Sequence, residues 1–256
     1  MIDRLVLITG ASSGIGLACA QTFAQAGARL ILAARRSDRL QALAADLKAK
    51  FGTATHVLKL DVCDRSAVEA CLQSLPSDWS GVDVLVNNAG LSRGLDRFQT
   101  AEVQDWEEMI DTNVKGLLYV TRTLLPGMIE RGQGHIINIG SIAGHQTYPK
   151  GNVYCATKAA VRAITEGLKL DLLGTPIRVS TVDPGLVETE FSQVRFHGDA
   201  ERAQSVYAGL TPLTPADVAD VVLFCATRPV HVNINEVVLM PTDQASATQV
   251  NRQNLS

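Results

Sequence analysis

The amino-acid sequence predicts an α/β fold, a single doubly wound parallel sheet of about seven strands with helices on both faces. Three observations predict it. Short apolar runs alternate with longer helical patterns along the chain. Most of these runs are apolar throughout, which is typical of strands buried on both faces. A glycine-rich turn stands between the first run and the first helix. Repeated alternation of strand and helix implies right-handed crossovers and therefore a parallel sheet.

The expected elements follow one another along the whole chain. The strands are expected at LVLIT (5–9), RLILAA (29–34), THVLKL (55–60), DVLVN (83–87), HIINIG (135–140), IRVSTVD (177–183) and EVVLM (236–240). The helices are expected at 14–27, 40–51, 103–131, 152–173 and 215–227. Ser37 is expected to cap the second helix, and Pro215 is expected in the first turn of the last one.

The 256 residues are expected to form one domain, because no linker or change of composition precedes about residue 243. We therefore assign residues 1–243 to this domain and residues 244–256 to a polar C-terminal tail. The tail lacks periodicity, and both fraying and packing against another subunit remain open for it. The segment at about 190–212 is polar and irregular, and it is the expected lid over a substrate.

Composition excludes several classes of function. The chain is 46% hydrophobic and 19% charged, with a formal net charge of -3 and no basic run, so no nucleic-acid partner is expected. No stretch of about 18 apolar residues occurs, and the first apolar run is too short for a signal segment, so no membrane association is expected. The five cysteines are scattered and form no C-x-x-C pair, which indicates reduced thiols in the cytoplasm. The histidines are equally dispersed, and no metal site is predicted.

The glycine-rich turn TGASSGIG (9–16) predicts a Rossmann-type nucleotide site. Gly10 permits a tight exit from the strand, while Gly14 and Gly16 let the backbone approach a pyrophosphate. The start of the following helix offers free N–H groups and a partial positive charge to phosphates. The cofactor-binding residues expected here are Gly10, Ser12, Ser13, Gly14, Ile15 and Gly16. A glycine turn without a ligand is the alternative.

The end of the second strand predicts NADP(H) in preference to NAD(H). An acidic residue at this position would bind the ribose 2′-hydroxyl of NAD, but the sequence has Arg35 and Arg36 instead. A guanidinium fork matches a 2′-phosphate in charge and in geometry. The alternative is that both arginines only interact with solvent at the start of a helix.

Tyr154 and Lys158 are separated by four positions on a predicted helix, so their side chains share one face. A free tyrosine has a pKa of about 10, and a nearby ammonium lowers that pKa by favouring the phenolate. Ser141 comes just after the fifth strand, at the carboxyl edge of the sheet where ligands bind in this fold class. The spacing of Tyr154 and Lys158 alone also occurs by chance in ordinary helices.

Taken together, these motifs resemble the short-chain dehydrogenase/reductase family over nearly the whole chain. The residues that carry the resemblance are TGASSGIG, Asp61, NNAG (87–90), Asn113, Ser141, Tyr154, Lys158 and PG (184–185), in the family's order and spacing. The resemblance implies Asn113, Ser141, Tyr154 and Lys158 as the catalytic residues. Tyr154 would be the acid/base of a hydride transfer, Ser141 would hold the substrate oxygen, and Asn113 would hold a water.

The resemblance also implies the remaining cofactor contacts and the assembly. Lys158 would bind the nicotinamide ribose, with Tyr154 beside it. The other implied cofactor residues are Asp61 and Val62 at the adenine, Asn88, Ala89 and Gly90 at the adenosine ribose, and Pro184, Gly185, Leu186, Val187 and Thr189 at the nicotinamide and pyrophosphate. Members are usually homotetramers, with the helices at 103–131 and 152–173 at one interface.

Four stretches narrow the resemblance to the NADP-dependent 3-hydroxy acid dehydrogenases. They are WEEMIDTNVKGLLYVTR, GNVYCATKAAVR, PGLVETEFSQVRFHGD and HVNINEVVLMPT. This subgroup implies serine, allo-threonine or 3-hydroxypropionate as substrate, and such a substrate needs a cation for its carboxylate. Arg195 is our candidate, His145 and Gln146 are further expected pocket residues, and Lys150 is a weaker one. A broad-specificity NADPH carbonyl reductase and a catalytically silent NADP-binding regulatory protein are the alternatives.

Overall fold

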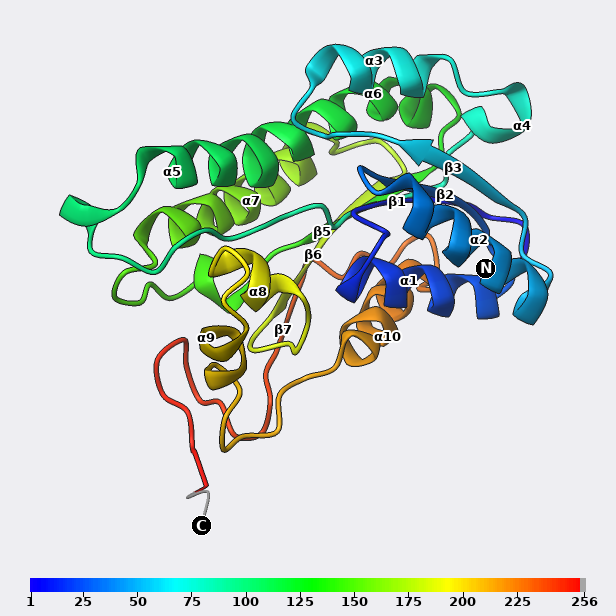
Figure 1. The fold of residues 1–256 in the computed structure, drawn as a ribbon. Coiled ribbons are helices and arrows are strands. Elements are labelled where there is room, and N and C mark those ends of the chain that lie inside the picture. The colour runs from blue at the N-terminus through cyan, green and yellow to red at the C-terminus, as the bar shows by residue number, and fades with distance from the viewer. Residues whose placement is uncertain (254–256) are drawn as a thin grey trace.

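The computed structural model describes residues 1–253 and confirms the predicted fold class. Seven strands form one parallel sheet in the order β3-β2-β1-β4-β5-β6-β7 (Figure 1). The strands are β1 Leu5–Thr9, β2 Arg29–Ala34, β3 Thr55–Lys59, β4 Val84–Asn87, β5 Gly134–Ile139, β6 Ile177–Pro184 and β7 Glu236–Leu239. The order reverses between β1 and β4, which is the point where ligands bind in doubly wound sheets.

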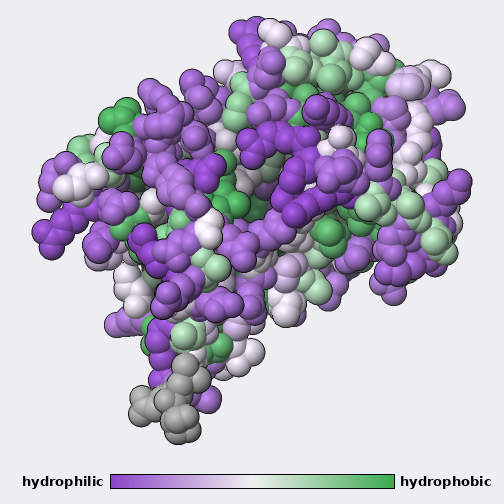
Figure 2. All heavy atoms as spheres, viewed as in Figure 1, coloured by the Kyte–Doolittle hydropathy of each residue, from purple (hydrophilic) through white to green (hydrophobic). Residues whose placement is uncertain are grey.

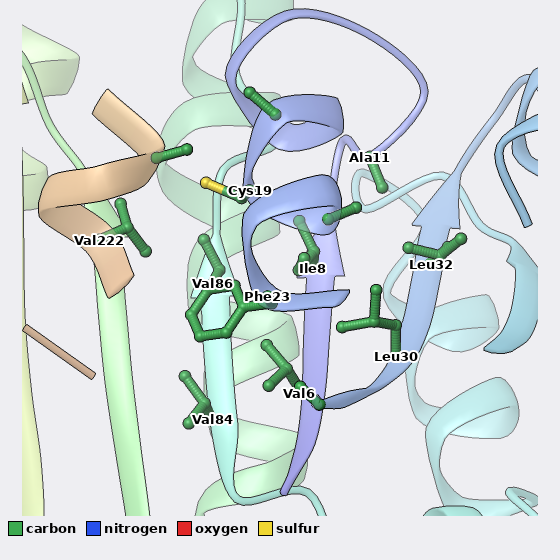
Figure 3. Close-up of a cluster of buried hydrophobic side chains, with 14 of the residues drawn as sticks. Val6, Ile8, Ala11, Cys19, Phe23, Leu30, Leu32, Val84, Val86 and Val222 are labelled. Carbon is green, nitrogen blue, oxygen red and sulfur yellow. The ribbon is translucent and has the colours of Figure 1, made fainter. Parts of the chain in front are cut away.

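Helices cover both faces of the sheet (Figure 1). One face carries α1 (Gly14–Gln25), α2 (Ser37–Phe51) and α10 (Pro215–Ala226), and the other carries α3 (Arg65–Gln73), α6 (Leu117–Glu130) and α7 (Asn152–Asp171). Val6 and Ile8 of β1 pack into the first core, while Leu5 and Leu7 pack into the second. Figure 3 shows the first core, where Phe23 of α1 lies against Val6, Val84 and Val86. The central strand is therefore buried on both sides, as its continuous apolar sequence indicates.

The predicted boundaries hold to about two residues for most elements, with three differences. The second helix begins at Ser37 with Arg36 at its N-cap, so the predicted capping role of Ser37 is wrong. The predicted helix at 103–131 is α5 (Val103–Ile110), a π-helical segment at Asp111–Gly116 and α6 in succession. The short helices α3, α4 (Ser77–Ser80), α8 (Phe191–Arg195) and α9 (Ala200–Ser205) were not predicted.

The last helix has the predicted proline at its start and a further cap that the prediction omitted. Pro215 follows Thr214, whose side chain accepts from the backbone N–H of Asp217, while the Asp217 carboxylate accepts from the N–H of Thr214. This reciprocal pair satisfies two free N–H groups at the helix start. Among the described residues, no helix is long and apolar enough to cross a membrane.

The described part of the tail does not fray but folds back on its own chain. Gln253 donates its backbone N–H to Gly209, and Arg252 donates to the carbonyls of Val206 and Ala208. Gln244 is buried and accepts from the N–H of Leu186 at 2.8 Å. The polar composition of the tail thus serves hydrogen bonds within the subunit; residues 254–256 lie outside the described part.

Candidate active site

A cavity of about 820 Å³ opens at the carboxyl edge of the sheet, within the range of small-molecule sites. Figure 2 shows a hollow on this face, with apolar atoms on its floor and hydrophilic residues around its rim. The predicted cofactor residues that line the cavity are Gly10, Ser12, Ser13, Gly14, Ile15, Arg35, Arg36, Asp61, Val62, Asn88, Ala89, Gly90, Tyr154, Lys158, Pro184, Gly185, Leu186, Val187 and Thr189. The cavity therefore joins residues from six separate stretches of the sequence.

The glycine-rich turn borders the cavity with its backbone, because its glycines have no side chains to fill the space. Gly10 and Gly14 have φ values of 65° and 53°, which favour glycine over residues with a Cβ. A Cβ at Gly16 would overlap the Asn88 amide and the Gly10 carbonyl, so Gly16 is a packing glycine and does not line the cavity. The side-chain amide of Asn88 stabilises the turn by donating to the carbonyls of Thr9 (2.9 Å) and Gly10 (3.2 Å). The N-cap side chain of α1, Ser13, makes no capping bond, so the first N–H groups of the helix face the cavity without a side-chain partner.

The two predicted arginines lie at the adjacent end of the cavity. Arg36 donates to the hydroxyls of Ser12 (3.2 Å and 3.1 Å) and Ser13 (2.7 Å), and to the Glu190 carboxylate (3.0 Å). Arg39, which was not predicted, pairs with the same Glu190 at 2.8 Å. Hydrogen bonds from Arg39 and Arg36 lower the pKa of the Glu190 carboxyl. This end of the cavity is thus a cationic site that already holds one anionic group of the chain.

Asp61 lies beyond β3 and not at its end. Its Oδ1 accepts from the N–H of Cys63 at 3.0 Å, and its Oδ2 lies 3.9 Å from Arg35. Asp61 does not cap the helix that follows, because the N-cap of α3 is Asp64, whose side chain accepts from the N–H of Ala67. Asp61 therefore faces the cavity and remains available to a ligand there.

Asn113 lies in the π-helical segment and its side chain is fully engaged. The amide donates to the carbonyl of Leu91 and accepts from its N–H, both at 2.8 Å, and it donates to the Thr157 hydroxyl at 3.1 Å. π-Helical segments are often found at functional sites. Asn113 does not line the cavity; it connects the loop after β4 to the turn of α7 that precedes Lys158.

Ser141, Tyr154 and Lys158, the predicted catalytic residues after β5 and on α7, all line the cavity. The Lys158 ammonium donates to the carbonyl of Ile139 at 2.9 Å. Burial lowers the pKa of Lys158 to about 8, while the charge of Asp183 acts in the opposite direction. Burial raises the pKa of Tyr154, as does Tyr148, whereas Arg195 and a hydrogen bond with Ser141 favour the phenolate. Among the described residues the cation that lowers the Tyr154 pKa is thus Arg195, and the Lys158 ammonium donates to a backbone carbonyl instead.

Arg195, on α8, lines the part of the cavity beside Tyr154. Its guanidinium carbon lies 5.2 Å from the ring centres of Tyr154 and Phe191 and 5.9 Å from that of Tyr148. It donates to the hydroxyls of Ser92 and Tyr148, both at 3.0 Å. No carboxylate among residues 1–253 pairs with it. A cation therefore lies over the tyrosine with no counter-ion from the described chain.

Comparisons with known proteins agree with this arrangement. The profile of the short chain dehydrogenase family matches residues 4–200. The chain belongs to the short-chain dehydrogenase family. It is 52% identical to the NADP-dependent 3-hydroxy acid dehydrogenase YdfG of Salmonella typhi, over 95% of this chain and 97% of that protein. It is 45% identical to the NADP-dependent 3-hydroxy acid dehydrogenase of Schizosaccharomyces pombe, over 97% of this chain and 96% of that one.

Solved structures give the same family. The closed form of a serine dehydrogenase complexed with NADP+ superposes with a TM-score of 0.91 at 49% identity, covering 98% of this chain and 100% of that chain. The serine dehydrogenase from Escherichia coli superposes with a TM-score of 0.82 at 45% identity, covering 94% and 100%.

Three predicted pocket residues of this short-chain dehydrogenase do not line the cavity. Ser141 is followed by a short 3₁₀ turn at Ile142–Gly144, and His145 and Gln146 come directly after it. His145 bonds to Asp183 at 2.7 Å, and Gln146 accepts from the N–H of Ala247 at 2.9 Å. Neither residue lines the cavity, and neither does Lys150. The cavity beside Tyr154 is lined instead by Tyr148 and Phe191, which carried no sequence signal beyond their aromatic character.

One group of possible metal ligands forms where the sequence predicted none. His145, Asp183 and Glu236 bring one ligand atom each to within 4.8 Å of one another. These atoms are already hydrogen-bonded: His145 pairs with both carboxylates, and Arg162 pairs with Glu236 at 3.0 Å. In this short-chain dehydrogenase the group therefore already has partners within the chain, and it lies beside the loop Ile139–Ser141.

Proposed function

We propose that the chain is an NADP-dependent dehydrogenase of small 3-hydroxy acids such as serine, allo-threonine or 3-hydroxypropionate. The observation that carries the proposal is Arg195, a cation without a carboxylate partner among the described residues, 5.2 Å above the Tyr154 ring. A substrate whose hydroxyl meets Tyr154 would have its carboxylate within reach of this guanidinium. The activities named for the relatives from Salmonella typhi and Schizosaccharomyces pombe support the same assignment.

The residues of the cavity are suited to hold NADP(H). Gly10 and Gly14 leave room for the pyrophosphate at the start of α1, and Arg36 with Ser12 and Ser13 offers donors to a 2′-phosphate. Bound NADP supplies the nicotinamide ring that takes up or releases a hydride. Asp61, Val62, Asn88, Ala89 and Gly90 are the proposed contacts to the adenosine, and Pro184, Gly185, Leu186, Val187 and Thr189 are those to the nicotinamide and pyrophosphate.

In the proposed mechanism the protein itself moves one proton. Tyr154 accepts the hydroxyl proton of the substrate in oxidation and returns it to the carbonyl oxygen in reduction. Ser141 holds that oxygen against Tyr154. The Lys158 ammonium favours the phenolate once it binds the nicotinamide ribose. Asn113 acts through its support of the turn before Lys158, where a water would pass protons onward.

The cofactor preference is testable at Arg36. Replacement of Arg36 by Ala is expected to raise the Kd for NADP+ by about ten- to a hundredfold, because charge-assisted bonds of roughly 1.5–3 kcal/mol are lost. The Kd for NAD+ should change little, since NAD+ has no 2′-phosphate. Calorimetric titration with both nucleotides measures this difference. Arg65→Ala on the surface of α3 is the matched control, and equal losses for both nucleotides in Arg36→Ala would contradict the assignment.

The substrate class is testable with the purified protein. Reduction of NADP+ would be followed at alkaline pH with L-serine, L-allo-threonine, 3-hydroxypropionate and a plain secondary alcohol. Turnover of the three acids, with poor turnover of the alcohol, is expected. Turnover of the alcohol alone would favour the broad-specificity carbonyl reductase, which the aromatic lining at Tyr148 and Phe191 could also serve. NADP+ binding without any turnover would favour the regulatory alternative.

We further propose the organisation around this site. Residues 1–243 form the catalytic domain, and residues 190–212 act as a lid over the substrate. In the tail, Arg252 and Gln253 brace that lid through their bonds to residues 206–209. The unpaired thiols of Cys19, Cys63, Cys71, Cys155 and Cys225 support a cytoplasmic protein.

Exposed apolar side chains along α5, α6 and α7 support a homotetramer built on these helices. Val103, Leu118 and Leu170 are among them. Light scattering measures the oligomeric state.

A further inference from the structure

A buried carboxylate lies behind the loop Ile139–Ser141, and neither the family motifs nor the proposed mechanism uses it. Asp183, near the end of β6, is 1% exposed. Its Oδ1 accepts from the Thr181 hydroxyl at 2.5 Å, and its Oδ2 lies 2.7 Å from Nε2 of His145. His145 also lies 3.4 Å from Glu236 on β7, which pairs with Arg162 of α7. Four charged or titratable groups from four parts of the fold therefore meet at one point.

Asp183 is in contact with the backbone that presents the catalytic residues. A Cβ at Gly140 would overlap Oδ1 of Asp183, so the carboxylate occupies the space that any other residue at position 140 would need. Gly140 stands between Ile139, whose carbonyl accepts from Lys158, and Ser141. The N–H of Gly140 donates to Val182 at 2.9 Å, which ties the same loop to the strand that carries Asp183. A change at Asp183 is therefore transmitted directly to both Lys158 and Ser141.

The charge of Asp183 acts on Lys158 as well. Burial raises the pKa of Asp183, while hydrogen bonds from Thr181 and His145 favour its ionised form. A nearby negative charge favours an ammonium, and Asp183 accordingly opposes the burial that lowers the pKa of Lys158. Tyr154, Ser141 and Asn113 are the other polar side chains around Lys158 that the mechanism uses, and none of them is an anion at neutral pH.

We propose that Asp183 is a positioning residue of the active site: its carboxylate holds the Ile139–Ser141 loop in place and is the buried counter-charge of the Lys158 ammonium, with His145 and Glu236 completing the cluster. The proposal rests on the proposed acid/base roles of Tyr154 and Lys158. It assigns His145 a supporting role in place of the predicted contact with substrate. It also explains why position 140 is a glycine.

The direct test is the titration of Lys158 in Asp183→Asn. The amide keeps the shape of the side chain and removes its charge, so the ammonium loses the interaction that favours it, and its titration midpoint should fall below the parent value of about 8. The midpoint would be measured by NMR of protein labelled at the lysine Cε, with Lys158→Met to assign the signal. This readout needs no turnover. An unchanged midpoint would overturn the proposal whatever the enzyme's activity proves to be.

The second readout is the pH profile of turnover. Because the cationic form of Lys158 is lost at lower pH in Asp183→Asn, the loss of kcat should be several-fold larger at about pH 9 than at about pH 7. A purely structural role would lower kcat by the same factor at both. Asp220→Asn on the exposed face of α10 is the matched control. Parent enzyme without turnover, combined with a shifted Lys158 midpoint, would refute the proposed function and leave this inference standing.

Gly140→Ala is a second variant for the same test, to be used if Asp183→Asn folds poorly. This variant retains every charge but removes the space that the carboxylate occupies, so Asp183 must move away from the loop. We expect a lower Lys158 midpoint together with a lower kcat. Loss of kcat with the Lys158 midpoint unchanged would show that the contact only shapes the loop, and would overturn the electrostatic part of the proposal.

Discussion

Replacement of Tyr154 by Phe is expected to lower kcat by about 10²–10⁴-fold, the usual contribution of a general acid or base. The phenyl ring keeps the packing of Tyr154 against Phe191, whose ring centre is 5.7 Å away. Only the hydroxyl that exchanges the proton is lost. The overall fold should therefore be unchanged. The Kd for NADP+ should change by no more than a few fold.

The measurement is kcat with saturating NADP+ and L-serine, together with a separate titration of NADP+ binding. Tyr119→Phe on α6 is the matched control, because it removes the same hydroxyl from a residue that does not line the cavity. Turnover of Tyr154→Phe close to that of the parent would exclude Tyr154 as the acid/base. A large loss of NADP+ binding would instead show that the hydroxyl serves the cofactor.

The burial of Tyr154 also sets the direction of the pH dependence. Burial raises the pKa of this phenol, so the protonated form dominates at neutral pH. Oxidation of an alcohol requires the phenolate, and its rate should therefore rise with pH. Reduction of a carbonyl requires the phenol and should be favoured toward neutral pH. The two directions of one reaction would thus have opposite dependences on the same ionisation.

Much of the fold could be predicted because each strand carries its own signal. Residues 5–9 are apolar without alternation, and the structure shows why: Val6 and Ile8 face one core, while Leu5 and Leu7 face the other. The edge strands β3 and β7 are only half-buried. They could still be predicted as strands, because they contain β-branched residues and occupy the expected places in the alternation of strands and helices. Short helices such as α3 were missed, because nine residues give too few turns for a periodic pattern.

The site could be predicted where one short stretch supplies both the residues and their spacing. The glycine turn and the Tyr154–Lys158 pair are of this kind, and both line the cavity. Asp183 could not be predicted, since its partners His145, Gly140 and Glu236 are distant in sequence and meet only when β5, β6 and β7 are adjacent. The orientation of His145 was wrong for a related reason. Its proximity to Ser141 in sequence indicated the pocket, whereas its ring bonds to Asp183 after the turn at Ile142–Gly144.

Replacement of Arg195 by Ala is expected to raise KM for L-serine by about ten- to a hundredfold, because a charge-assisted pair with the substrate carboxylate is lost. The variant has a second effect that must be separated from the first. Arg195 lowers the pKa of Tyr154, so its removal should also reduce kcat for every alcohol in the oxidative direction. A plain secondary alcohol is therefore the internal reference, since it reports the effect on Tyr154 without any carboxylate.

The decisive quantity is the ratio of kcat/KM for L-serine to kcat/KM for the plain alcohol, compared between the parent and Arg195→Ala. Arg202→Ala is the matched control, because Arg202 also belongs to the segment 190–212 and also lies over an aromatic ring, 4.4 Å from that of Phe196. A ratio that falls only in Arg195→Ala identifies the carboxylate site. An equal fall for both substrates would leave Arg195 as a modulator of Tyr154 alone, and would place the recognition of the substrate carboxylate elsewhere in the cavity.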